Sequence, residues 1–132
     1  MGMPVSIHVR CPDPRSADIE RAVAAAHHEL ARLEDVFSTW RPDSHVSRLA
    51  RGEIALAHCD PLMGEVIALC AEATHLTGGA FTAHLPDHTG QRLFNPTGLV
   101  KGWAVDRAGE ILSGLPGAAW CINAGGDLLA GR

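Results

Sequence analysis

Residues 95–107, with the sequence NPTGLVKGWAVDR, are predicted to join a turn to a helix. The turn is indicated by Asn-Pro, because the residue before a proline avoids the helical region. Past Gly102, apolar residues recur at three- and four-residue spacings, which predicts a helix. Gly98, Lys101 and Gly102 would then lie at or just before a helix N-terminus, where free N–H groups and the helix dipole favour an anion. The stretch is therefore either a phosphate site or an ordinary loop-to-helix junction, and the local pattern favours the junction.

Two regular elements are predicted near the N-terminus. Val5, Ile7 and Val9 alternate with polar residues, which is typical of a half-buried strand. Apolar residues then recur every three or four positions over residues 19–37, and this predicts an amphipathic helix. Ser16 or Asp18 is a suitable cap for that helix.

Residues 37–49, FSTWRPDSHVSRL, predict an irregular joint followed by a short helix. Asp43 or Ser44 can cap this helix, and Gly52 can close it. Trp40 stands just before the helix. The local pattern favours a tryptophan that packs on the core, and the alternative is one that stacks on a flat aromatic ligand.

One more helix and a pair of strands are predicted after residue 59. Asp60-Pro61 begins a helix that Gly78 ends. Residues 83–94 are polar and rich in turn residues, and Pro86 argues against the helix that a zinc-binding pair of histidines would need there. Residues 119–122 and 128–129 read as short strands joined by a glycine turn.

The composition is that of one soluble globular domain, or part of one: 132 residues, 46% hydrophobic and 20% charged. The net charge of -4 gives no footprint for nucleic acid or for an anionic membrane. The four cysteines form no C-x-x-C pair, so we expect free thiols and a cytoplasmic location. No apolar run reaches the roughly 18 residues of a membrane helix.

Packed on so few strands, the predicted helices would leave the core poorly covered and one strand edge open. We therefore expect that the chain lacks part of a fold or obtains strands from another chain, for example in a homodimer.

Five motifs together resemble the FAD:protein FMN transferases, the ApbE-like flavin transferases. The resemblance spans the whole chain, and each motif is weak alone but specific in this order. The motifs are MGMPV at 1–5, FSTWRPDS at 37–44 with SRL at 47–49, TGGAF at 77–81, GLVKGWAVD at 98–106 and NAGGD at 123–127.

The resemblance implies an α+β fold, an ApbE-like (T-fold-like) sheet with packed helices that is incomplete in this chain. Residues 1–132 would be the N-terminal part of a single FMN-transferase domain. The implied activity moves FMN from FAD to a threonine hydroxyl of a target protein, releases AMP and depends on Mg²⁺. The alternatives are a non-enzymatic or degenerate FAD-binding module, an inactive truncated fragment, and a hydrolase that splits FAD with water.

The resemblance also implies which residues bind the cofactor, and it leaves the catalytic residues unassigned. Gly98 matches a position whose backbone carbonyl helps to bind the metal, and such an oxygen suits magnesium. The positions that match FAD-binding residues are Met1, Trp40, Ala80, Phe81, Thr82, Asn95, Lys101 and Arg107.

Three positions depart from the family pattern. The family usually has Asp where Thr82 and Asn95 stand, and it tends to have Asn at Ala50. The family's second half, which carries Asp-x-x-x-Thr metal ligands and a histidine motif, lies outside this sequence.

Overall fold

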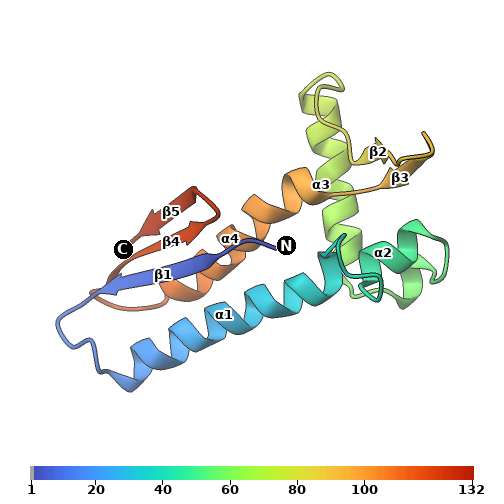
Figure 1. The fold of residues 1–132 in the computed structure, drawn as a ribbon. Helices are drawn as coiled ribbons and strands as arrows, with labels where there is room; N and C mark the ends of the chain where they lie inside the picture. Colours follow the sequence, from blue (N-terminus) through green and yellow to red (C-terminus); the bar gives the residue numbers. More distant parts are fainter. Residues whose placement is uncertain (1) are drawn as a thin grey trace. The chain divides into compact units, whose positions relative to one another are not determined.

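The computed structural model describes residues 2–132, and these residues form two compact units. We call residues 2–32 with 102–132 the sheet unit, and residues 33–101 the hairpin unit. Figure 1 shows the elements of both units along the chain.

A three-stranded antiparallel sheet organises the sheet unit. Its strands are β1 (Val5–Arg10), β4 (Ala119–Ala124) and β5 (Asp127–Gly131), in the order β1-β4-β5. Gly125 and Gly126 both have positive φ, 57° and 99°, which is the backbone of a tight two-residue hairpin turn between β4 and β5. The strands predicted near the N-terminus and after residue 118 are confirmed.

Helices cover this sheet, as Figure 1 shows for α4 (Thr97–Ser113). Gly109 of α4 lies so close to the sheet that an added Cβ would be 2.7 Å from Leu129 Cδ2 and 2.9 Å from Trp120 Cη2. The sheet-unit part of α1 (Ala17–Phe37) is joined to α4 by an ion pair between Glu29 and Arg107. Ala108 and Leu112 of α4 and Ile122 of β4 are each 0% exposed, and the burial of such apolar side chains stabilises this unit.

The hairpin unit contains the end of α1, α2 (His45–Ala50), a 3-10 turn η1 (Leu56–His58), α3 (Leu62–Leu76), and two short strands, β2 (His84–Pro86) and β3 (Arg92–Phe94), before α4 begins. The predicted Ser44 cap is confirmed, because the backbone N–H of Ser47 donates to Ser44 Oγ at 3.1 Å. Just before α3, whose N-cap is Pro61, the backbone N–H of Leu62 donates to Asp60 Oδ1 at 2.9 Å.

Residues 83–94, which are polar and rich in turn residues, contain two short strands that the sequence pattern did not predict. Leu85 pairs with Leu93 in an antiparallel hairpin. Its turn is held by Asp87, whose Oδ1 accepts from the backbone N–H of Thr89 at 2.8 Å and of Gln91 at 3.0 Å. Strands of three residues are too short to show an alternating pattern, and Pro86 pointed away from regular structure.

The predicted start of the last helix is wrong. The helix α4 begins at Thr97 rather than after Gly102, so Gly98, Lys101 and Gly102 lie inside it. The reason is a local cap: Asn95 Oδ1 accepts from the backbone N–H of Thr97 at 3.1 Å and from Thr97 Oγ1 at 2.5 Å. Gly98 and Gly102 interrupt the apolar spacing in the first turns, so the pattern did not predict this part of the helix.

All four cysteines are free thiols, as expected. Within residues 2–132, none of the helices combines the length and the apolar character needed to cross a bilayer.

Candidate functional site

Trp40 stands on the surface of the hairpin unit, between α1 and α2. Its side chain is 83% exposed. The interpretation that this tryptophan packs on the core is therefore wrong. An indole this exposed leaves its faces available to a flat ligand.

Trp40 and Lys101 line the same cleft, although they come from different motifs. The cleft has a volume of about 50 Å³, and its walls are residues 37–40 on one side and Thr97, Val100 and Lys101 on the other. Ser38 is only 1% exposed, and its hydroxyl has no hydrogen-bond partner among residues 2–132. A buried polar group without a partner is uncommon in folded proteins.

Asn95 lines a second, larger hollow of the hairpin unit, of about 290 Å³. Ala50 of α2 lies in the same wall, and Thr39 belongs both to this hollow and to the cleft beside Trp40. The hairpin residues Leu85 and Phe94 make this hollow partly apolar. The two hollows together form a candidate site that offers two cations, Lys101 and Arg51, one carboxylate, Asp87, several hydroxyl groups and an aromatic wall.

The other predicted site residues of the hairpin unit lie outside these hollows. Phe81 contacts Gly98, since a Cβ added to Gly98 would be 3.2 Å from Phe81 Cε2. Ala80 is exposed, and Thr82 Oγ1 accepts from the backbone N–H of His84 at 3.2 Å. Met1 lies outside the described residues.

Arg107, the remaining predicted residue, belongs to the sheet unit. Its Nε donates to Glu29 Oε1 at 3.0 Å, and its guanidinium carbon lies 5.3 Å from the centre of the Trp103 ring. The side-chain hydrogen bond from Arg32, together with the one from Arg107, lowers the pKa of Glu29. Arg107 is thus held in place by an anion and by an aromatic ring.

The sequence prediction missed Ser38, Thr39 and Thr97, which also line the cleft. Small hydroxyl residues are frequent in loops and caps, so their number near Trp40 gave no signal of a ligand site. The one clue was the position of Ser38 and Thr39 directly before Trp40 in the quoted motif.

The described residues do not fit a magnesium site of their own. No group of three or more His, Cys, Asp or Glu side chains that could hold a metal ion occurs within residues 2–132. The Gly98 carbonyl lies in the first turn of α4, where helix geometry directs it to a backbone N–H further along. One such oxygen is far from the roughly six that Mg²⁺ requires.

Comparison with known proteins now gives the family. A family model described as the ApbE family matches residues 1–89. The chain belongs to the ApbE family. No match was found among the curated proteins.

Solved structures of two ApbE proteins share the fold. The apo flavinyl transferase ApbE from Pseudomonas stutzeri is 19% identical with a TM-score of 0.70, over 98% of this chain and 58% of that chain. A histidine-to-glycine variant of the flavin transferase ApbE from Vibrio cholerae is 16% identical with a TM-score of 0.70, over 96% and 61%. The Vibrio cholerae protein without that change gives 16%, a TM-score of 0.67, and 96% and 59%.

These comparisons confirm the α+β, ApbE-like fold expected from the motifs. They also show its extent, because this ApbE-family chain spans only 58 to 61% of the length of the two structures with the higher TM-scores.

Proposed function

We propose that this ApbE-family chain is part of a flavin transferase that moves FMN from FAD to a threonine hydroxyl of an acceptor protein and releases AMP. The observation that carries the proposal is the cleft shared by Trp40 and Lys101. Family membership and the flavin transferases among the similar structures support it. Residues 1–132 would form the N-terminal part of one domain.

The cleft has the donor groups that a dinucleotide needs. The exposed face of Trp40 can stack on a heteroaromatic ring, which is the usual way an aromatic side chain holds one. Lys101 supplies positive charge for a phosphate group. By resemblance we also assign FAD contacts to Met1 and Asn95.

A second group of FAD contacts, like that of Met1, rests on resemblance alone. It consists of Ala80, Phe81, Thr82 and Arg107. Single substitutions at these positions should weaken FAD binding less than Trp40→Ala or Lys101→Gln does.

The reaction forms one bond and breaks one. The acceptor threonine Oγ bonds to the phosphorus atom of the FMN half, and the bond from that phosphorus to the bridging oxygen breaks. AMP leaves with the bridging oxygen, and the hydroxyl proton passes to a base or to solvent. The residues described here bind and orient the donor, and we assign no base among them.

Magnesium and the acceptor are further parts of the proposal. A Mg²⁺ ion, with the Gly98 carbonyl as one ligand, would neutralise charge on the diphosphate. Because the described residues do not complete its coordination, no step is assigned to it. We propose a cytoplasmic location and an acceptor protein with a target threonine, and a homodimer is one way to supply further strands.

The test is intact mass spectrometry of a threonine-containing acceptor peptide after incubation with the chain, FAD and Mg²⁺. The same reaction is repeated with the remaining two-fifths of an ApbE protein added as a separate chain. An FMN adduct in either reaction supports the proposal. If both reactions leave the peptide unmodified while FAD is bound, the transferase proposal is wrong.

A second candidate, a non-enzymatic FAD-binding module, is favoured by Thr82 and Asn95, which stand where carboxylates are usual. Titration with FAD, followed by the fluorescence of FAD itself, separates the cases. Binding without turnover supports the module, and the absence of binding excludes both functions.

A further inference from the structure

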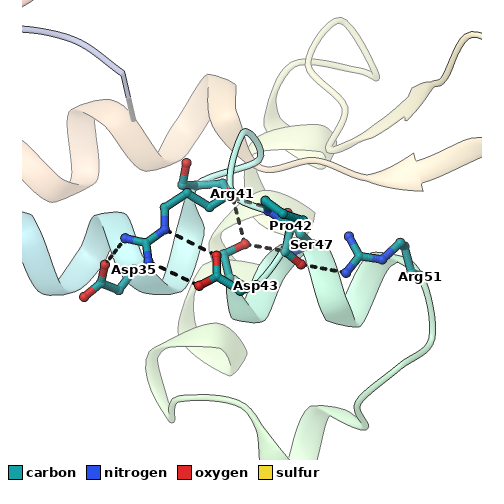
Figure 2. A network of polar contacts seen from close by, with 8 residues as sticks. Asp35, Arg41, Pro42, Asp43, Ser47 and Arg51 are labelled. Carbon is teal, nitrogen blue, oxygen red and sulfur yellow. Dashed lines mark hydrogen bonds and ion pairs between the residues drawn. The ribbon is translucent and has the colours of Figure 1, made fainter.

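The loop that carries Trp40 is fixed at both ends while its tryptophan points into solvent. Ser38 before it and Ser44 after it are each 1% exposed, whereas Trp40 is 83% exposed. Exposed loops are usually mobile, so the contacts that hold this one are of interest. The contacts that hold this loop are shown in Figure 2.

Buried serines hold the first side of the loop. Ser44 Oγ donates to the Ser38 carbonyl oxygen at 2.7 Å, and Ser47 Oγ donates to the same oxygen at 3.2 Å. Ser44 Oγ also accepts from the backbone N–H of Ser47 at 3.1 Å. The carbonyl that precedes Trp40 by two residues is thus bonded to the first turn of α2 through both of its lone pairs.

Two arginines hold the second side, directly after the tryptophan. The Arg41 guanidinium forms an ion pair with Asp35 of α1 and donates to both carboxylate oxygens of Asp43, from Nε at 3.4 Å and from Nη2 at 3.3 Å. Arg51 Nη2 donates to the Pro42 carbonyl oxygen at 2.6 Å. The hydrogen bond with Asp43 raises the pKa of Arg41 and lowers that of Asp43, so both groups stay charged.

We propose that Arg41 is a positioning residue, which acts through Trp40 by fixing the loop so that the indole is a preformed stacking surface for a planar heteroaromatic ring, flavin or purine. This inference rests on the proposed function. A planar, bidentate guanidinium suits the role, because it fixes two partners in one geometry. A loop that is ordered before binding avoids the entropy loss of ordering it on the ligand.

A double-mutant cycle on the full chain tests the inference, with FAD as the probe and FAD fluorescence as the signal. The variants are Arg41→Gln, Trp40→Ala and the two combined. We expect Arg41→Gln to weaken FAD binding about 3- to 10-fold when Trp40 is present and to have no further effect in Trp40→Ala. An equal loss in both backgrounds would overturn the inference, because Arg41 would then act independently of the tryptophan.

A matched control removes another exposed ion pair. Arg21→Gln breaks the pair between Arg21 and Asp18 on α1 and should leave FAD binding unchanged. If Arg21→Gln weakens binding as much as Arg41→Gln, the effect is one of general charge, and the inference fails.

A ligand-free measurement keeps the test valid if FAD does not bind, an outcome that would count against the proposed function only. The chain contains three tryptophans, so 5-fluorotryptophan gives a simple ¹⁹F spectrum in which Trp40→Phe assigns one resonance. Arg41→Gln should narrow the Trp40 resonance, as faster motion would, and leave those of Trp103 and Trp120 unchanged. An unchanged Trp40 line would show that Arg41 does not fix the loop.

Discussion

Each unit of this ApbE-family chain treats a tryptophan differently. In the hairpin unit, Trp40 is 83% exposed and its loop is held by serine and arginine contacts. In the sheet unit, Trp120 of β4 is 6% exposed. Glycines make room for it, because a Cβ at Gly109 would lie 2.9 Å from its ring and a Cβ at Gly131 would lie 2.4 Å from it.

For these two tryptophans, the neighbours in space reveal the role of the side chain better than the neighbours in sequence. Glycines opposite Trp120 let helix and strand backbone approach the ring, so the ring serves packing. Polar contacts around Trp40 order the backbone and leave the ring uncovered, so the ring is presented to solvent. Breaking each arrangement should therefore affect different properties of the protein.

Substitution of the two tryptophans should have very different effects on the free energy of unfolding, and this difference is the largest that we expect. Trp120→Ala should lower the free energy of unfolding by about 3–5 kcal/mol, because it removes a buried aromatic ring and leaves a cavity. Trp40→Ala should change it by less than about 0.5 kcal/mol. Urea unfolding followed by circular dichroism measures both. A loss in Trp40→Ala comparable with that in Trp120→Ala would mean that the exposed ring contributes to packing after all.

The next effect compares two glycines of α4. Alanine in a helix interior is normally more stable than glycine by roughly 0.5–1 kcal/mol, so Gly102→Ala should stabilise the chain, since its Cβ meets no atom within 4 Å. Gly109→Ala should instead destabilise it by about 1–3 kcal/mol, because its Cβ would overlap Leu129 and Trp120.

Thermal melts of the two glycine variants side by side decide the matter. If Gly109→Ala proves as stable as Gly102→Ala, the close approach of α4 to the sheet is not required by the fold.

Much of the fold could be predicted from the sequence. The alternation of Val5, Ile7 and Val9 is matched by an alternating burial pattern in β1, and the helix predicted over residues 19–37 lies within α1. Such periodic patterns depend only on which side of an element faces the core. The hairpin of β2 and β3 could not be predicted, because its pairing depends on a turn that the Asp87 side chain closes.

Less of the candidate site could be predicted. Motif resemblance identified Trp40 and Lys101, and the structure places both in one cleft. The exposure of Trp40 was not predictable, since it depends on how the surrounding chain closes around the loop. The place of Ser38 in the wall of the cleft could not be predicted either, because a serine in a loop usually caps a helix or forms a turn.

A smaller effect concerns the start of α4 in the hairpin unit. Asn95→Ala removes the acceptor for the backbone N–H of Thr97 and should cost about 1 kcal/mol of stability. Asn95→Asp, the matched control, keeps an acceptor and adds a negative charge near a helix N-terminus, so it should be neutral or slightly stabilising. Equal destabilisation by both substitutions in urea unfolding would show that the amide N–H₂, rather than the acceptor oxygen, is needed.

The smallest effect is the pH dependence that Glu29 gives to the sheet unit. Pairing with Arg32, and then with Arg107, lowers the pKa of Glu29 in the folded chain. A lowered folded pKa means that the pairing stabilises the fold above the unfolded pKa, about 4.3 for glutamate, and that this contribution is lost as the pH falls through the folded value.

Glu29→Gln should therefore be less stable than the natural chain at pH 7, by about 0.5 kcal/mol. This difference should shrink as the pH falls below the unfolded pKa of glutamate, about 4.3, and through the lower folded value. Asp18→Asn removes a carboxylate from the exposed pair with Arg21 and controls for the loss of one charge. Urea unfolding at a series of pH values from 7 to 3 measures the difference. If the gap between Glu29→Gln and the natural chain stays constant across that range, the stabilisation comes from packing of the side chain and not from its charge.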